Sequence, residues 1–305
     1  MQVGLMFEGQ MGINWEYWKR ILDIADNSGY QSVFRSDHFT SPTGAIQDAL
    51  ELWTSLTYAA AMTKNIEFGP MVTPITFRHP AFIAQYAASV DVLSEGRLVL
   101  GMGTGWQDRE HEAFGIYFPP ISDRYERLQD GLEIVSRLFS ADEPISYEGK
   151  HFSLKDAQIT MKRKDTQILI GGNGPKKTLP LAAKYAVEWN AVYLNIEDFK
   201  DRNELLNGYL EEEGRALSSM KRSLMIACIY GKDDASLAKA LEGRGGSKED
   251  LQARGFVVGT GSEIVDILGE WQEAGLDRIM LQWTDLENLA SLEDMAHDIL
   301  PHFHK

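Results

Sequence analysis

Short apolar runs alternate with amphipathic segments along nearly the whole chain of 305 residues. The apolar runs have the length and composition of strands buried on both faces, and the segments between them carry apolar residues at helical spacing. Eight such pairs follow one another, which predicts a parallel sheet closed into a (β/α)8 barrel in preference to an open doubly wound sheet. The predicted strands are VGLMF, SVFR, IEFGPMV, RLVLG, QILIGG, AVYLN, SLMIACIYG and RIMLQW.

Two segments interrupt this alternation. Residues 142–165, after the fourth helix, contain an EGK turn between short β-type runs, which predicts an inserted hairpin. Residues 232–254, after the seventh strand, are rich in Gly, Lys and Asp, and we expect a mobile insertion on the rim of the active site. Both insertions are compatible with one domain spanning residues 1–305.

The composition of the chain limits the kinds of partner that it is expected to bind. The net charge of −15 argues against nucleic acid and against an anionic membrane, because both require clustered Lys and Arg. The chain has no apolar run of about 18 residues that would span a membrane, and Met1 leads through VGLMF into polar EGQ without a signal peptide. We therefore expect a cytoplasmic protein that binds a small molecule. The single cysteine, Cys228, lies in an apolar run and is predicted to be a buried, inert thiol.

The segment from Arg97 to Pro119, RLVLGMGTGWQDREHEAFGIYFP, is the most informative part of the chain. A strand runs into three alternating glycines, Gly101, Gly103 and Gly105, which leave the main chain open to the approach of a flat ring or a phosphate. Trp106 supplies an aromatic wall behind them. The charged residues that follow include Glu110 and His111, which we interpret as scaffolding.

In a parallel barrel the functional groups come from the loops that follow the strands. This rule selects a set of rim positions: Glu8, residues 36–38, 70–78, 103–111 and 171–177, Asn195, Tyr230 and Trp283.

Asp37 and His38 follow the second strand directly, in RSDHF. They offer an imidazole that titrates near neutral pH beside a carboxylate. The alternative interpretation is that Asp37 pairs with Arg35 or caps a turn, and that His38 is an ordinary surface residue. In the third rim loop, GPMVTPITFRHP, the prolines predict a rigid floor, and Arg78 either binds an anion or makes a structural pair.

The segment GGNGPKKT at 171–178 follows the fifth strand and opens a helix. Its glycines expose N–H groups at a positive helix end, and Lys176 or Lys177 adds charge, so we predict a phosphate cradle, with plain helix capping as the alternative. Glu110, His111 and Glu112 lack the second histidine of an HExxH pair, so we predict no metal site. No serine has the context of a nucleophile elbow, which argues against a covalent hydrolase.

Taken together, these segments resemble the bacterial luciferase-like monooxygenase superfamily, whose members are flavin- and deazaflavin-dependent TIM barrels. The resemblance covers essentially the whole chain. It is carried by SDHF, TPITFRHPAFIAQ, the glycine segment from Arg97 to Pro119, GGNGPKKTLPLAAKYAVEWN and VVGTGSEIVDILGEWQEAGLDRIMLQW.

This resemblance implies a ring cofactor stacked over the barrel mouth, backed by a bulge with an unusual cis peptide after the third strand. The bulge would lie near Pro70 and Met71, with either Gly69–Pro70 or Pro70–Met71 in the cis form. Other contacts implied in the same way are the ring edge at Thr104, Gly105 and Trp106, and the phosphate at Gly171, Gly172, Asn173, Gly174, Pro175 and Lys176.

Asp37 and His38 match the pair found in deazaflavin-using members, where the pair flanks the reactive carbon and helps to bind or protonate substrate. Some dehydrogenase members carry Glu directly after the glycine run, where Trp106 stands here, and this departure argues against sugar-phosphate dehydrogenation. The resemblance also implies a homodimer.

The first hypothesis for function is an oxidoreductase that moves hydride between coenzyme F(420), an 8-hydroxy-5-deazaflavin, and a small organic substrate. His38 would act as acid or base and Asp37 would position it, beside an apolar wall of Trp106, Phe39, Met71 and Trp283. One alternative is a two-component monooxygenase that uses reduced flavin mononucleotide (FMN) and oxygen. An alternative of another class is a non-catalytic flavin-binding protein.

Overall fold

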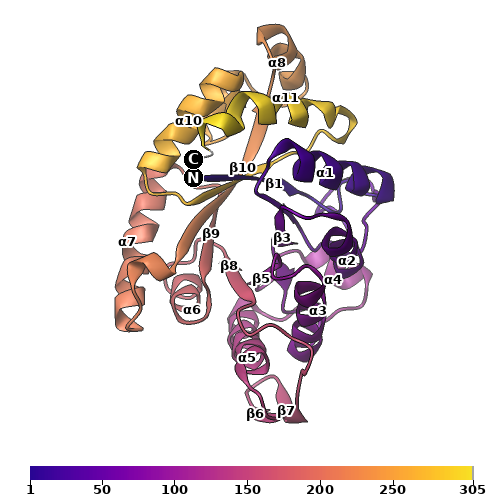
Figure 1. Cartoon of the computed structure of the whole chain (residues 1–305), viewed down its shortest axis with the longest axis vertical. Helices are drawn as coiled ribbons and strands as arrows, with labels where there is room; N and C mark the ends of the chain where they lie inside the picture. The colour runs from indigo at the N-terminus through magenta and orange to yellow at the C-terminus, as the bar shows by residue number, and fades with distance from the viewer. Residues whose placement is uncertain (304–305) are drawn as a thin grey trace.

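A barrel of parallel strands surrounded by helices forms the body of the molecule (Figure 1). The computed structural model describes residues 1–303. The strands pair in the order β3, β2, β1, β12, β10, β9, β8, β5 and β4. Because β3 and β4 are two parts of one interrupted strand, the barrel has the eight predicted positions. The bounds are β1 Gln2–Phe7, β2 Ser32–Arg35, β3 Glu67–Pro70, β4 Thr73–Pro74, β5 Val99–Gly103, β8 Gln167–Gly171, β9 Glu188–Val192, β10 Lys221–Tyr230 and β12 Arg278–Gln282.

The interrupted third strand closes the barrel. The N–H of Phe68 in β3 donates to the carbonyl of Arg97 at 3.0 Å, and β4 pairs with β5 from Thr73 onward. Between the two parts, the Met71–Val72 peptide is cis. The predicted bulge is therefore present, but the cis bond is at neither of the two peptides that we expected from the sequence.

The helices pack around the outside of the strands. The first begins at Asn14, whose side chain accepts from the N–H groups of Glu16 and Tyr17, and it ends at Gly29, whose φ of +91° is readily adopted by glycine. The bounds are α1 Trp15–Ser28, α2 Leu52–Met62, α3 Pro80–Leu93, α4 Asp108–Ala113, α5 Ile121–Ser140, α6 Thr178–Tyr185, α7 Ile196–Glu212, α10 Gly261–Glu273 and α11 Ala290–Ile299. Of these, α4 was expected to be part of a rim loop.

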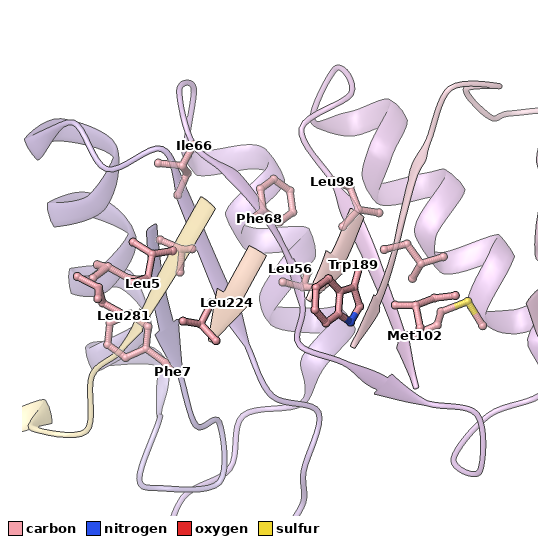
Figure 2. Close-up of a cluster of buried hydrophobic side chains, with 14 of the residues drawn as sticks. Leu5, Phe7, Leu56, Ile66, Phe68, Leu98, Met102, Trp189, Leu224 and Leu281 are labelled. Carbon is pink, nitrogen blue, oxygen red and sulfur yellow. The ribbon is translucent and has the colours of Figure 1, made fainter. Parts of the chain in front are cut away.

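Apolar side chains fill both sides of the strand layer. Figure 2 shows part of the layer between strands and helices, with Leu5, Phe68, Met102, Trp189 and Leu224 among its residues. A second cluster draws one residue from nearly every part of the barrel and fills its inside: Met6, Phe34, Met71, Val99, Leu169, Met225 and Met280. The interior is therefore a packed core and not a channel.

A buried polar group lies below this core, at the end of the barrel where the strands begin. Arg278 at the start of β12 is fully buried and donates to Gln2 at 3.0 Å and to Glu67. Its Nη1 also lies 3.4 Å from a carboxylate oxygen of Glu188, which is equally buried. The sequence prediction placed the sixth strand at AVYLN, whereas β9 begins three residues earlier. The reason is that the polar Glu188 and Asn190 are buried in β9 and conceal its start.

Both predicted insertions are present. After α5, β6 (Ile145–Glu148) and β7 (Ser153–Ala157) form an antiparallel hairpin at one end of the molecule (Figure 1). After β10, the chain forms α8 (Asp234–Leu241), α9 (Lys248–Ala253) and β11 (Val257–Gly259), and β11 pairs with β10. The second insertion is thus folded into helices around a small core of Ile229, Leu237, Leu251 and Val258.

Candidate functional site

The predicted site residues all lie at the end of the barrel where the strands finish, which we call the mouth. Asp37 and His38 follow β2, while Pro70 and Met71 lie at the end of β3. The ends of β5 and β8 supply the others: Thr104, Gly105, Trp106, Gly171, Gly172, Asn173, Gly174, Pro175 and Lys176. The predicted positions therefore lie around one opening.

The glycine segment fits against the bulge of the interrupted strand. A Cβ on Gly103 would lie 2.4 Å from Cγ2 of Val72, and a Cβ on Gly101 would lie 2.1 Å from the carbonyl oxygen of Pro70. A Cβ on Gly171 would also approach Val72, at 3.1 Å. We expected the alternating glycines to leave room for a ligand, but Gly101 and Gly103 instead admit the bulge. Gly105 is required for a different reason: its φ of +75° lies in the left-handed region, which glycine adopts readily.

His38 is bound by Glu110, a residue that the sequence prediction treated as scaffolding. Nδ1 of His38 lies 2.7 Å from Oε1 of Glu110, and the other carboxylate oxygen accepts from the N–H of Phe39 at 2.8 Å. Glu110 is almost fully buried in α4. Sequence reasoning missed this contact because the two residues are 72 positions apart. It depends on the short helix 108–113, which turns residue 110 toward the loop after β2.

The surroundings of His38 favour its charged form. Burial alone would lower the pKa of the imidazole, but the hydrogen bond and the charge of Glu110 outweigh burial, with Glu8 and Asp37 adding to the effect. The net result is a pKa of His38 above its ordinary value. The edge of the imidazole meets Trp106, with ring centroids 5.5 Å apart and an interplanar angle of 77°.

Asp37 has a different set of partners. It is buried and accepts from Thr73 Oγ1 at 2.8 Å and from Arg78 Nη1 at 2.5 Å, and Arg78 also pairs with Glu51 at 2.9 Å. The described residues show no hydrogen bond between Asp37 and His38, whereas Glu110 contacts the imidazole directly. The sequence left open whether Arg78 binds an anion or makes a structural pair, and the second interpretation holds in this structure.

Trp106 projects from a loop that Arg124 holds in place. The guanidinium of Arg124 stacks 4.2 Å over the ring of Phe118 and donates to the carbonyl of Gly105. The indole of Trp106 is 62% exposed, which is unusual for so large an apolar side chain. The expected aromatic wall is therefore available to a ligand at this residue. Met71 is instead in the barrel core, and Trp283 is buried with its Nε1 bonded to the carbonyl of Asp285.

The loop from Gly171 to Lys177 has the geometry of an anion cradle. Asn173 fixes it by two hydrogen bonds to the main chain of Val192, at 2.7 and 3.0 Å. Among the described residues, no acceptor is bonded to the N–H groups of residues 173, 174, 176 and 177, which precede α6. The side chains of Lys176 and Lys177 are exposed beside them. Free N–H groups, a helix start and two cations together suit a phosphate.

A polar network lines the opposite side of the mouth. Tyr193 after β9 donates to Gln282 at the end of β12, whose amide donates to Glu8 at 2.7 Å. Gln10 also donates to Glu8, at 2.9 Å, and accepts from Ser36 at 2.8 Å. Sequence reasoning selected Glu8 as a rim position and missed Tyr193 and Gln282, which carry no motif.

Within residues 1–303, no group of three or more His, Cys, Asp or Glu side chains is arranged to hold a metal ion. In the same range, none of the helices combines the length and the apolar character needed to cross a membrane.

Comparison with known proteins assigns the family. The family model for luciferase-like monooxygenases matches residues 2–285, so this chain belongs to that family. A solved structure of an F(420)-dependent secondary alcohol dehydrogenase superposes over 100% of this chain and 99% of its own, with a TM-score of 0.88 and 19% identity. At that identity the likeness concerns the fold.

Two relatives are similar in sequence. An F(420)-dependent glucose-6-phosphate dehydrogenase of Microbacterium testaceum is 36% identical over 51% of this chain and 46% of its own length. An F(420)-dependent hydroxymycolic acid dehydrogenase of Mycobacterium tuberculosis is 30% identical over 71% of this chain and 59% of its own length. The matched region thus spans about half of each of these relatives.

Proposed function

We propose that this chain is an oxidoreductase that transfers hydride between coenzyme F(420) and a small organic substrate. The observation that carries the proposal is the pair of His38 and Glu110 at the mouth, beside the exposed Trp106. The F(420)-dependent dehydrogenases among the sequence relatives support it as well.

The residues present fit such a cofactor. The free N–H groups of the loop 171–177 would hold its phosphate, and the main chain at Thr104 and Gly105 with the indole of Trp106 would border its ring. Pro70, Met71 and Val72 would support the ring from below, since the bulge reaches the mouth between β3 and β4. When bound, the deazaflavin donates or accepts a hydride.

His38 would handle the proton of the reaction. With a carbonyl substrate, Nε2 of His38 gives a proton to the oxygen while the carbon receives the hydride, which produces an alcohol. With an alcohol substrate, the same nitrogen removes the hydroxyl proton as the hydride leaves. An imidazole whose pKa is raised above its ordinary value by Glu110 can serve as the acid in one direction and as the base in the other.

Fluorescence titration tests the proposal. The protein is titrated with F(420) and with FMN, and turnover is followed by deazaflavin absorbance over a panel of small alcohols and ketones. We expect F(420) to bind, and His38→Ala to keep that binding while it loses turnover. Tight binding of FMN without binding of F(420) would overturn the proposal, and indifference of both affinity and turnover to His38→Ala would remove His38 from it.

A second candidate is a monooxygenase that uses reduced FMN and oxygen, as the description of the matched family suggests. The same phosphate loop and ring border would serve FMN. Oxygen consumption decides between the two, because a deazaflavin does not activate oxygen. Consumption of oxygen coupled to substrate in the presence of reduced FMN would favour the second candidate.

We also propose that the protein is a homodimer in the cytoplasm and that α2 and α3 form its contact face. The only charged residue in these two helices is Asp91, which is buried. Exposed on them are Met62, Phe82, Tyr86 and Leu93. In a chain of net charge −15, a surface without acidic groups is where two copies meet with least repulsion.

Light scattering after size exclusion tests the dimer. We expect the wild type to elute as a dimer and the double variant Phe82→Glu with Tyr86→Glu to elute as a folded monomer. An unchanged dimer in this variant would place the contact elsewhere, and a monomeric wild type would refute the dimer itself.

A further inference from the structure

We infer that Glu110 is a positioning residue that fixes the tautomer of His38, so that Nδ1 carries a hydrogen and Nε2 is the nitrogen presented to the substrate. This inference deepens the proposed function and rests on it for the identity of the reaction. The hydrogen-bond geometry that carries it lies wholly within this chain.

The tautomer follows from the acceptors around the ring. An ionised carboxylate only accepts hydrogen bonds. Oε2 of Glu110 accepts from the N–H of Phe39, and Oε1 lies 2.7 Å from Nδ1 of His38, so Nδ1 must be the donor. Nε2 has no hydrogen-bond partner among residues 1–303, and the side chain is 13% exposed at the mouth. The free lone pair of the neutral ring is therefore on Nε2.

Three residues at the start of α4, counting its N-cap Gln107, hold this arrangement by hydrogen bonds to one loop. Gln107 donates to the carbonyl of Thr40 at 2.7 Å, and Arg109 donates to the carbonyls of Ser41 and Gly44 at 2.9 and 3.1 Å. The carboxylate of Glu110 then forms hydrogen bonds with the side chain of His38 and with the main-chain N–H of Phe39. Helix α4 thus fixes the loop 38–44 from one side, and Glu110 is the contact that reaches the imidazole.

The other charged groups around His38 act in the same direction. Glu8 at the end of β1 and Asp37 in the same loop both favour the imidazolium, and Asp37 is itself paired with Arg78. Glu110 makes the only hydrogen bond to the ring within the described part of the chain. Its removal should therefore change both the tautomer and the pKa of His38, whereas Glu8 and Asp37 act on the pKa alone.

Nitrogen-15 NMR of the imidazoles tests the inference in the protein without cofactor. His38 is assigned by the signal lost in His38→Asn. In the wild type we expect the Nδ1–H tautomer at high pH and a pKa above the ordinary value of about 6.5. In Glu110→Gln, the amide oxygen of the glutamine can accept from the N–H of Phe39 only if the amide NH2 group faces Nδ1 of His38. Nδ1 must then accept a hydrogen bond, so we expect the opposite tautomer. We also expect the pKa of His38 to be lower than in the wild type by about one pH unit or more, because the charge of Glu110 is lost.

A second His–Glu pair provides the matched control. Nε2 of His151 lies 3.1 Å from Glu126 on the hairpin side of the molecule. We expect Glu126→Gln to shift the signals of His151 and to leave those of His38 unchanged. Shifts of His38 in this control would mean that the effect of Glu110→Gln is not specific.

Kinetics supply a second readout. The limb of the pH profile of kcat/KM that reports His38 should move to lower pH in Glu110→Gln, and Glu110→Asp should restore part of the shift. A wild-type His38 in the Nε2–H tautomer, or with a pKa at or below the ordinary value, overturns the inference even if Glu110→Gln fails to fold. Because these NMR readings need no cofactor, their failure is distinguishable from a failure of the deazaflavin proposal, which the binding titration decides.

Discussion

The side chain of Val72 occupies the space that a Cβ on Gly103 would need, with Cγ2 2.4 Å from that position. The bulge between β3 and β4 and the glycine segment of β5 are therefore complementary surfaces. The two segments are separated by about thirty residues of sequence, yet each requires the other. This contact places the floor of the mouth directly beside the loop that carries Trp106.

Gly103→Ala should displace the bulge and weaken cofactor binding. The added methyl group overlaps Val72 in a packed region, and overpacking of this kind costs about 1–3 kcal/mol of unfolding free energy. Denaturant unfolding and cofactor titration measure the two effects. The control is Gly208→Ala in α7, where a Cβ would meet no atom within 4 Å. That change should stabilise by about 0.5–1 kcal/mol, and equal effects of the two variants would contradict the prediction.

Trp106→Ala should weaken binding of the deazaflavin about tenfold, which corresponds to about 1.4 kcal/mol, through loss of an aromatic contact. Because the indole is 62% exposed, thermal unfolding should change little. Tyr117→Ala removes an aromatic side chain of similar exposure, 68%, from the same segment. Fluorescence titration should show normal affinity for that variant. The prediction fails if the two substitutions are equivalent.

Arg278→Ala should be among the most damaging single substitutions outside the mouth. It removes the nearer of the two cations beside the buried Glu188 and the partly buried Glu67 and leaves them with Lys221 at 3.9 Å. Breaking a buried ion pair in this way costs about 3–5 kcal/mol. Lys164→Ala breaks an exposed pair with Asp142 and should have no measurable effect. Urea denaturation of both variants gives the comparison.

Glu188 should give the protein a specific pH dependence. Burial raises the pKa of Glu188 above its ordinary value, with Arg278 and Lys221 opposing that effect. The folded state therefore binds this proton more tightly than the unfolded state, so the stabilisation is fully present below the ordinary pKa and is lost as pH rises through the folded pKa. The unfolding free energy of the wild type relative to Glu188→Gln should increase as pH is lowered toward about 4.5. A difference independent of pH would contradict this.

Cys228 should be inert in the folded protein. Burial raises the pKa of its thiol to about 12, and its Sγ packs 3.8 Å from Sδ of Met295. Because the thiolate is the reactive form, iodoacetamide at pH 8 should label the denatured chain and leave the native chain unlabelled. Mass spectrometry measures the labelling, and rapid labelling of the native chain would show that the site opens.

Much of the fold could be predicted because buried parallel strands are continuously apolar. VGLMF, SVFR and RIMLQW correspond closely to β1, β2 and β12. The prediction was wrong where polar residues point into the barrel. Glu188 and Asn190 belong to β9 but do not look like strand residues, because their burial depends on Arg278 and Ser223 from other strands.

The site could be predicted as a set of loops but not as a set of side-chain contacts. The rule that functional residues follow the strands identified Asp37, His38 and the loop 171–177. It could not say that Asp37 would bind Arg78 while His38 turned toward Glu110. Which of two adjacent side chains faces a given partner depends on the backbone dihedral angles of an irregular loop. The spacing of residues in the sequence does not determine this local backbone conformation.

The insertion formed by α8, α9 and β11 has a small core of its own and joins the barrel at β10 and α10. The residues proposed to bind the cofactor and to transfer the proton all precede α7 in the sequence. A lineage could therefore exchange this piece without rebuilding the reactive centre. In the laboratory, replacing this insertion with the corresponding segment of a relative tests whether it influences substrate preference while the residues proposed for hydride transfer stay in place.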